Sequence, residues 1–147
     1  MNFPILSSLI LLPVVGSLFL LFSKDKNSNT GKYVALFTSF VNFLISLYLW
    51  YQFDPTTSDF QFVEDREWLK GIINYKIGID GISILFIVLT ALITPLCIIS
   101  VNNTVKDRLR DFLIAILVME SLMIGVFCSL DLVIFYLFFE AGLIPMF

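Results

Sequence analysis

The fold of this chain is decided by residues 112–147, which read FLIAILVMESLMIGVFCSLDLVIFYLFFEAGLIPMF. The charged side chains in this stretch are those of Glu120, Asp131 and Glu140. A helix needs about 20 mainly apolar residues to cross a bilayer, so one crossing fits on each side of Asp131. We therefore predict transmembrane helices over Phe112–Leu130 and Leu132–Phe147. They should be antiparallel neighbours, because almost no loop joins them.

The same spacing of charges continues toward the N-terminus. The nine basic and twelve acidic residues fall mostly in tight clusters. Three further apolar gaps of bilayer length lie between the clusters, at Met1–Ser23, Tyr33–Phe53 and Gly81–Val105. The sequence thus predicts an all-α integral membrane protein with about five transmembrane helices.

The composition supports this class and excludes others. Hydrophobic residues make up 59% of the chain and charged residues 14%, whereas a soluble domain has about 25% charged residues. The chain has no histidine and no CxxC pair, so the sequence predicts no metal or haem site. A weakly acidic net charge of −3 disfavours nucleic acid as a partner. The expected surroundings are therefore the lipid bilayer and other membrane subunits.

The loops predict the orientation of the helices. The basic residues of the first and third loops are Lys24, Lys26, Lys32, Lys106, Arg108 and Arg110. Between these loops, residues 54–80 hold six acidic and only three basic residues. Because basic loops stay on the inner side of a membrane, we expect this acidic loop and the N-terminus on the outer side.

The acidic loop and the helix starts carry local signals. Ile73, Tyr75, Ile77 and Ile79 alternate with more polar or small residues. This period of two predicts a strand, and a short hairpin turning near Lys70-Gly71 is expected outside the membrane. Aspartates at positions 80, 111 and 131 precede predicted helices, where we expect them to cap the free N–H groups.

Glu120 and Glu140 are the two acidic residues inside predicted spans. Glu140 lies nine residues from Asp131, or about 13 Å along a helix, and Glu120 lies ten residues from Leu130, or about 15 Å. Both carboxyl groups should therefore lie near the bilayer midplane. An acidic residue there costs about 2.5 to 3.5 kcal/mol on insertion scales, and such residues usually have a function.

Proton handling is the chemistry that suits these glutamates. Burial raises the pKa of a carboxyl group and a nearby cation lowers it, so a movable cation would load and release a proton. Every lysine and arginine lies in a predicted loop, so a cation beside Glu140 would have to come from another chain. The alternative is a protonated glutamate that is hydrogen-bonded to a neighbouring helix and inert. Spacing does not decide whether Glu120 and Glu140 face each other.

Several stretches of the sequence resemble one protein family. They are residues 129–147 (SLDLVIFYLFFEAGLIPMF), residues 75–83 (YKIGIDGIS), the loop segments 52–54 and 60–64 with Trp68-Leu69 after them, and residues 120–127 (ESLMIGVF). Together they resemble the N-terminal portion of the chain 4 family of NADH–ubiquinone oxidoreductase, or respiratory complex I, called subunit M in bacteria. The combination of these stretches at this spacing is specific.

The resemblance implies an antiporter-like subunit of the membrane arm that helps translocate protons while electrons pass from NADH to quinone. Glu140 matches the fifth-helix glutamate of the family, which pairs with a lysine on a later helix. It would load the proton, and Glu120 would be a possible relay. Residues 1–131 would form helices one to four with the acidic outer loop, and residues 132–147 would start the proton-translocating domain.

The resemblance also bears on cofactors, partners and location. This chain would bind no cofactor, since FMN, iron–sulfur clusters and ubiquinone would lie in other subunits. Family members are far longer, so either a second chain supplies the later lysines or this is a fragment. The expected location is the mitochondrial inner membrane, or alternatively the bacterial plasma membrane. Two other functions stay open: a subunit of a multisubunit cation/proton antiporter, and a structural membrane subunit with inert glutamates.

Overall fold

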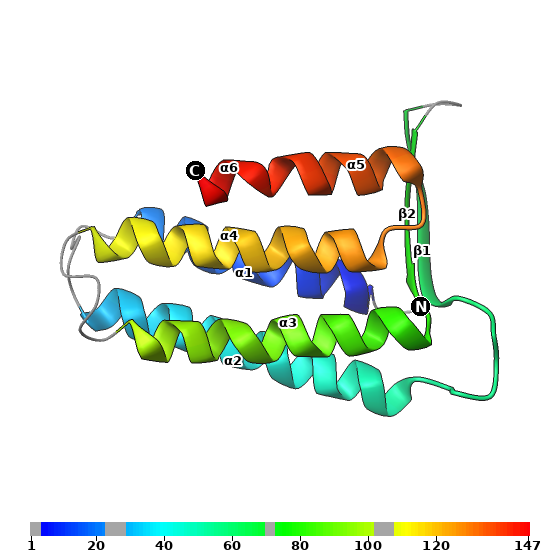
Figure 1. Ribbon diagram of the computed structural model, residues 1–147, viewed down its shortest axis with the longest axis horizontal. Helices are drawn as coiled ribbons and strands as arrows, with labels where there is room; N and C mark the ends of the chain where they lie inside the picture. Colours follow the sequence, from blue (N-terminus) through cyan, green and yellow to red (C-terminus); the bar gives the residue numbers. More distant parts are fainter. Residues whose placement is uncertain (1–3, 23–28, 70–72, 102–107) are drawn as a thin grey trace.

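Six helices and one β-hairpin make up the computed structural model, which describes residues 4–22, 29–69, 73–101 and 108–147. The helices are α1 (Ile5–Leu21), α2 (Asn29–Gln52), α3 (Gly81–Ser100), α4 (Leu109–Cys128), α5 (Leu132–Ala141) and α6 (Leu143–Met146). The strands β1 (Gln61–Leu69) and β2 (Ile73–Ile79) lie between α2 and α3. Figure 1 shows the helices side by side with the hairpin across one end.

The predicted membrane fold is confirmed. Three helices are long and apolar enough to cross a bilayer, and they span Thr30–Gln52, Gly81–Ser100 and Leu109–Cys128. Two shorter apolar helical segments, Ile5–Leu21 and Leu132–Met146, occupy the first and fifth predicted spans. Five apolar segments thus lie where the spacing of charges placed them, and the chain is a multi-pass membrane protein.

Helix α4 lies at the centre of the arrangement. It packs against α1, α2, α3 and α5, whereas α5 packs mainly against α4 and β2. Gly125 allows α5 to approach closely, because a Cβ atom there would lie 2.7 Å from the ring of Phe138. Gly16 does the same between α1 and α2, where a Cβ atom would lie 2.7 Å from Thr38. Short distances between backbones are typical of helices that associate in a bilayer.

The hairpin forms where alternation predicts it. β1 and β2 are antiparallel, with Arg66 opposite Tyr75, and Ile77 and Ile79 are fully buried. The turn predicted near Lys70-Gly71 lies outside the described residues. The hairpin is anchored to α1, because Glu64 accepts hydrogen bonds from the backbone N–H and the hydroxyl of Ser7 at 3.0 and 2.9 Å. Glu64 thereby supplies the first turn of α1 with an acceptor that its N-cap residue, a proline, lacks.

Two of the three predicted caps are present. Asp80 accepts from the backbone N–H groups of the second and third residues after it, at the start of α3, and Asp131 does the same at the start of α5. The prediction for Asp111 was wrong, because α4 already begins at Leu109. Arg108 is the residue before the helix, with a φ of 58°. Asp111 lies in the first turn and pairs with Arg108 at 3.1 Å, which favours the positive end of the helix dipole.

Acidic residues predominate at one end of the bundle and basic residues at the other. The hairpin lies at the end where α3 and α5 begin (Figure 1), whereas Lys32 and Arg110 lie in the first turns of α2 and α4 at the other end. These two residues belong to helices rather than to loops, because both helices extend beyond the predicted apolar spans. The loop residues Lys24, Lys26 and Lys106 lie outside the described residues.

The cap at Asp80 makes a testable contribution to stability. Hydrogen bonds from Ser83, with a smaller one from Ile82, hold the pKa of Asp80 below its ordinary value of 3.8. The ionised carboxylate therefore stabilises the fold above that value, and the contribution is lost as the pH falls through the lowered pKa. Asp80→Ala should cost about 1 kcal/mol of stability at neutral pH and little in acid, measured as the unfolding temperature in detergent. The exposed Asp59→Ala is the control, and an equal loss at both pH values would contradict the cap.

Candidate functional site

Glu120 lies on the face of α4 that points into the protein. The buried residues of α4 recur every three or four positions and are Leu113, Leu117, Glu120, Ser121, Ile124, Gly125 and Cys128. This is the period of one helix face, so the carboxyl group shares a side with the core leucines. The Glu120 side chain is 2% exposed. Next to it, the Ser121 hydroxyl donates to the backbone carbonyl of Ile10 and ties α4 to α1.

The partner of Glu120 is Asn42 on α2. The Asn42 side-chain amide donates from Nδ2 to Glu120 Oε1 at 3.0 Å, and Asn42 itself is fully buried. Sequence reasoning missed this residue. The available signal was a polar stripe inside an apolar span, since Ser39, Asn42 and Ser46 recur at helical spacing. The hydroxyls of Ser39 and Ser46 donate to carbonyls of their own helix, whereas the longer Asn42 side chain reaches α4.

One oxygen of each partner has no hydrogen bond among the described residues. These atoms are Glu120 Oε2 and Asn42 Oδ1, and both are buried. Buried polar atoms nearly always have a partner, so such a pair is unusual in a native structure. The pairing of a carboxyl with a neutral amide also leaves the carboxyl without a counter-ion. The site can therefore hold a proton, and the described residues supply no cation there to balance a permanent negative charge.

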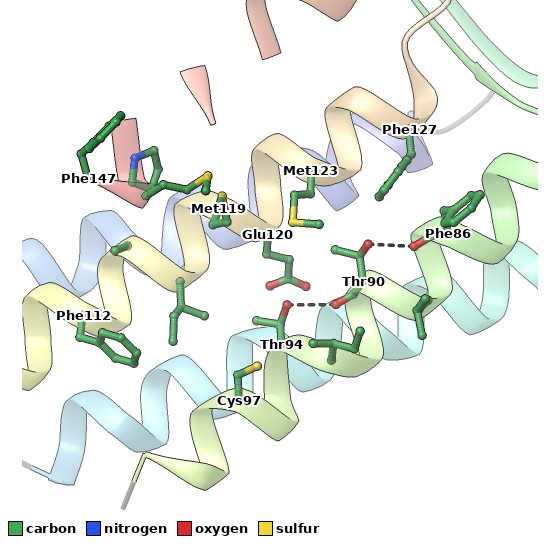
Figure 2. A pocket seen from close by; sticks show the side chains of 16 residues that line it. Phe86, Thr90, Thr94, Cys97, Phe112, Met119, Glu120, Met123, Phe127 and Phe147 are labelled. Carbon is green, nitrogen blue, oxygen red and sulfur yellow. Dashed lines mark hydrogen bonds between the residues drawn. The ribbon is translucent and has the colours of Figure 1, made fainter. Parts of the chain in front are cut away.

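Glu120 lines a groove of about 610 Å³ between α3, α4 and α6. Figure 2 shows its carboxyl group pointing toward α3, where the side chains of Thr90 and Thr94 lie. Both hydroxyls donate to carbonyls of their own helix at 2.8 and 3.0 Å, and each keeps oxygen lone pairs that can accept a hydrogen bond. The rest of the lining is mostly apolar, including Phe86, Met123 and Phe127. The groove thus brings one buried acid and two hydroxyls into an otherwise apolar space.

Glu140 has a different environment. It lies on α5 and is exposed in this chain. The side chains one and two turns away on the same face are also exposed, with Leu132 at 81%, Tyr136 at 60% and Ile144 at 77%. The opposite face of α5, which includes Ile134, packs against the protein. Exposing a carboxyl group to lipid in the middle of an apolar helix face costs free energy, and a protein partner that covers this face would remove that cost.

The two glutamates do not form one site within this chain. Glu120 points inward to Asn42, whereas Glu140 lies on the exposed face of α5. In the part of the chain that the structure describes, neither carboxyl group has an ion pair, and Arg108 and Arg110 pair with Asp111 at the start of α4. The described residues also contain no cluster of three histidine, cysteine, aspartate or glutamate side chains that could hold a metal ion.

Several curated proteins that are similar to this chain are named NADH-ubiquinone oxidoreductase chain 4 or NADH-quinone oxidoreductase subunit M. NADH-ubiquinone oxidoreductase chain 4 of Marchantia polymorpha is 48% identical over 143 residues, which are 97% of this chain and 29% of that protein. NADH-quinone oxidoreductase subunit M of Rhodobacter capsulatus is 56% identical over 123 residues, or 84% of this chain and 23% of that protein. Subunit M of Rickettsia prowazekii is 40% identical over 151 residues, covering 100% of this chain and 31% of that protein. No protein-family model matches the chain.

The chain spans about 30% of the length of the curated relatives it matches. The identity of 40 to 56% extends over 84 to 100% of this chain. The chain is therefore a homologue of one portion of the NADH-ubiquinone oxidoreductase chain 4 / NADH-quinone oxidoreductase subunit M family.

Proposed function

We propose that this chain works in the membrane arm of an NADH:quinone oxidoreductase, complex I, and contributes to proton translocation driven by electron transfer from NADH to quinone. Sequence identity to chain 4 and subunit M proteins supports this assignment, and so do the apolar helices. The chain performs no redox chemistry in this proposal. FMN, iron–sulfur clusters and ubiquinone belong to other subunits of the complex.

Glu140 is the proposed proton-loading group, and its position on an uncovered apolar face of α5 is the observation that carries the proposal. A lysine from the remaining portion of the subunit, or from a partner chain, lies against this face and pairs with the carboxylate. When the lysine approaches, the charged form of Glu140 is favoured and a proton leaves. When it retreats, the carboxyl group takes a proton up again.

Glu120 is the proposed relay. It is buried inside the bundle and faces a groove lined by two threonine hydroxyls, so it can exchange a proton without leaving the protein interior. In this proposal residues 1–131 form the supporting helices and the acidic loop 54–80, and residues 132–147 begin the proton-translocating domain. Glu120 therefore lies among the supporting helices, and Glu140 lies in the proton-translocating domain.

The proposed location is an energy-converting membrane, with the mitochondrial inner membrane favoured over the bacterial plasma membrane. The proposed orientation places the N-terminus and the hairpin on the outer side. The excess of acidic residues at the hairpin end and of basic residues at the other end supports this orientation, because basic residues are retained on the inner side.

Native extraction tests the assignment. We expect the chain, extracted in mild detergent and separated on a native gel, to migrate with NADH-dehydrogenase activity. Mass spectrometry of that band should identify, besides flavin and iron–sulfur subunits, the sequence that carries the later helices and their lysines. Migration with ion-transport subunits and no flavoprotein would instead assign the chain to a cation/proton antiporter.

A further inference from the structure

Glu120 and Asn42 each have one buried oxygen without a hydrogen bond in addition to the bond that joins them. Asn42 Nδ2 donates to Glu120 Oε1 at 3.0 Å, which leaves Oδ1 of the amide and Oε2 of the carboxyl group without partners among the described residues. A carboxamide offers a donor and an acceptor side by side, and so does a protonated carboxyl group. Both unpartnered atoms are acceptors as they stand, and a single hydrogen on one of them turns the pair into a donor and an acceptor.

We infer that Asn42 is the positioning residue for a proton on Glu120, holding the protonated carboxyl group in a cyclic pair of two hydrogen bonds. In this pair Asn42 Nδ2–H donates to Oε1, and the hydroxyl at Oε2 donates to Asn42 Oδ1. To leave, the proton turns with its O–H bond from Asn42 Oδ1 toward a water molecule in the groove, which takes it up as hydronium; the second bond is then broken and the first is kept. The inference deepens the relay function proposed above for Glu120 and rests on it for its place in proton transfer.

The charges around Glu120 indicate that a proton, rather than a basic side chain, neutralises its carboxylate. Within the described ranges, α1 and α3 carry no charged residue at all. The charged residue of α2 is Lys32, ten positions before Asn42, or about 15 Å along the helix. On α4 the other charged residues are Arg110 and Asp111 in the first turn, and α5 carries Glu140 on its exposed face. Strand β2, which also packs against α4, carries Lys76, whose backbone carbonyl accepts from the N–H of Leu130, about 15 Å along the chain from Glu120. Among the described residues, no cation from the elements packed against α4 is therefore placed to balance the Glu120 carboxylate.

The position of Asn42 suits a positioning function. It reaches Glu120 from α2, whereas the groove beside Glu120 is lined by α3, α4 and α6. The amide therefore holds the carboxyl group from the closed side and leaves the groove side free for proton exchange. A neutral amide also retains its hydrogen-bonding groups throughout, so it can hold the carboxyl group in both protonation states.

Infrared difference spectroscopy of the assembled complex in liposomes tests the inference. A protonated carboxyl group has a carbonyl stretching band separate from that of a carboxylate, and Glu120→Gln assigns the band by removing it. We expect Asn42→Leu to shift the band to higher wavenumber, because the carbonyl loses its N–H donor. Asn42→Ser, which is polar but too short to form both bonds, should shift the band in the same direction. Ser46→Ala, one turn along α2, is the matched control and should leave the band in place.

The outcomes separate this inference from the proposed function. If the carboxylic acid band is absent at every pH, the inference is overturned, because Glu120 is then charged and a water molecule bridges it to Asn42. A band that Asn42→Leu or Asn42→Ser leaves unshifted overturns it as well. A band that shifts as expected supports the pair. If Glu120→Gln then leaves proton translocation unchanged, the pair stands and the relay function fails.

Discussion

Replacing Glu140 by glutamine should leave the complex assembled and lower its rate of proton translocation by roughly 10²-fold, the scale on which a positioned acid–base group contributes. Glutamine has nearly the same shape but cannot take up or release a proton. Glu140 is exposed on α5, and its carboxyl group has no ion pair within the described part of this chain, so the substitution should leave the packing of the chain intact. The amount of complex on a native gel and the acidification of liposomes during NADH oxidation are the two measurements.

Two controls make the Glu140 result specific. Glu140→Asp keeps a carboxyl group on a shorter side chain and should retain part of the translocation rate. Phe139→Leu changes the neighbouring residue, which is 55% exposed, and keeps the glutamate, so it should translocate normally. Normal proton translocation in Glu140→Gln would show that this carboxyl group is structural.

Glu120→Gln should be as stable as the unchanged chain while translocating protons about tenfold more slowly, an effect smaller than that of a general acid or base, because Glu120 is proposed only as a relay. The glutamine oxygen can still accept from Asn42 Nδ2, and its own N–H can donate to Asn42 Oδ1. Both buried groups then have partners without any proton on the side chain. The relay is lost and the packing between α2 and α4 is kept.

Glu120→Leu is the matched variant that separates stability from proton transfer. Leucine removes the acceptor and leaves the buried amide of Asn42 without a partner, which should cost about 1–3 kcal/mol. The unfolding temperature of the complex and its amount on a native gel measure this loss. If glutamine and leucine lower the translocation rate and the stability equally, Glu120 contributes packing and hydrogen bonding alone.

The sequence determines much of this protein because membrane insertion and helix capping depend on local chemistry. The spacing of charges located five apolar segments, the alternation from Ile73 to Ile79 located a strand, and aspartates marked the starts of α3 and α5. Position along a span also placed Glu120 and Glu140 at a depth where charge is expensive. Asp111 shows the limit of this reasoning, because a helix can begin before its apolar run does.

Only the tertiary structure decided which way each side chain faces. In a soluble helix the polar face marks the solvent side, but a membrane helix has apolar residues toward both lipid and protein. The rotation of α4 and α5 about their axes therefore cannot be read from their sequences. Packing against other helices determines it, and it joins Asn42 to Glu120 across 78 positions of sequence. The same packing leaves Glu140 on an uncovered face. The depth of the two glutamates in the membrane could thus be predicted from the sequence, whereas the tertiary structure determined which residues contact them.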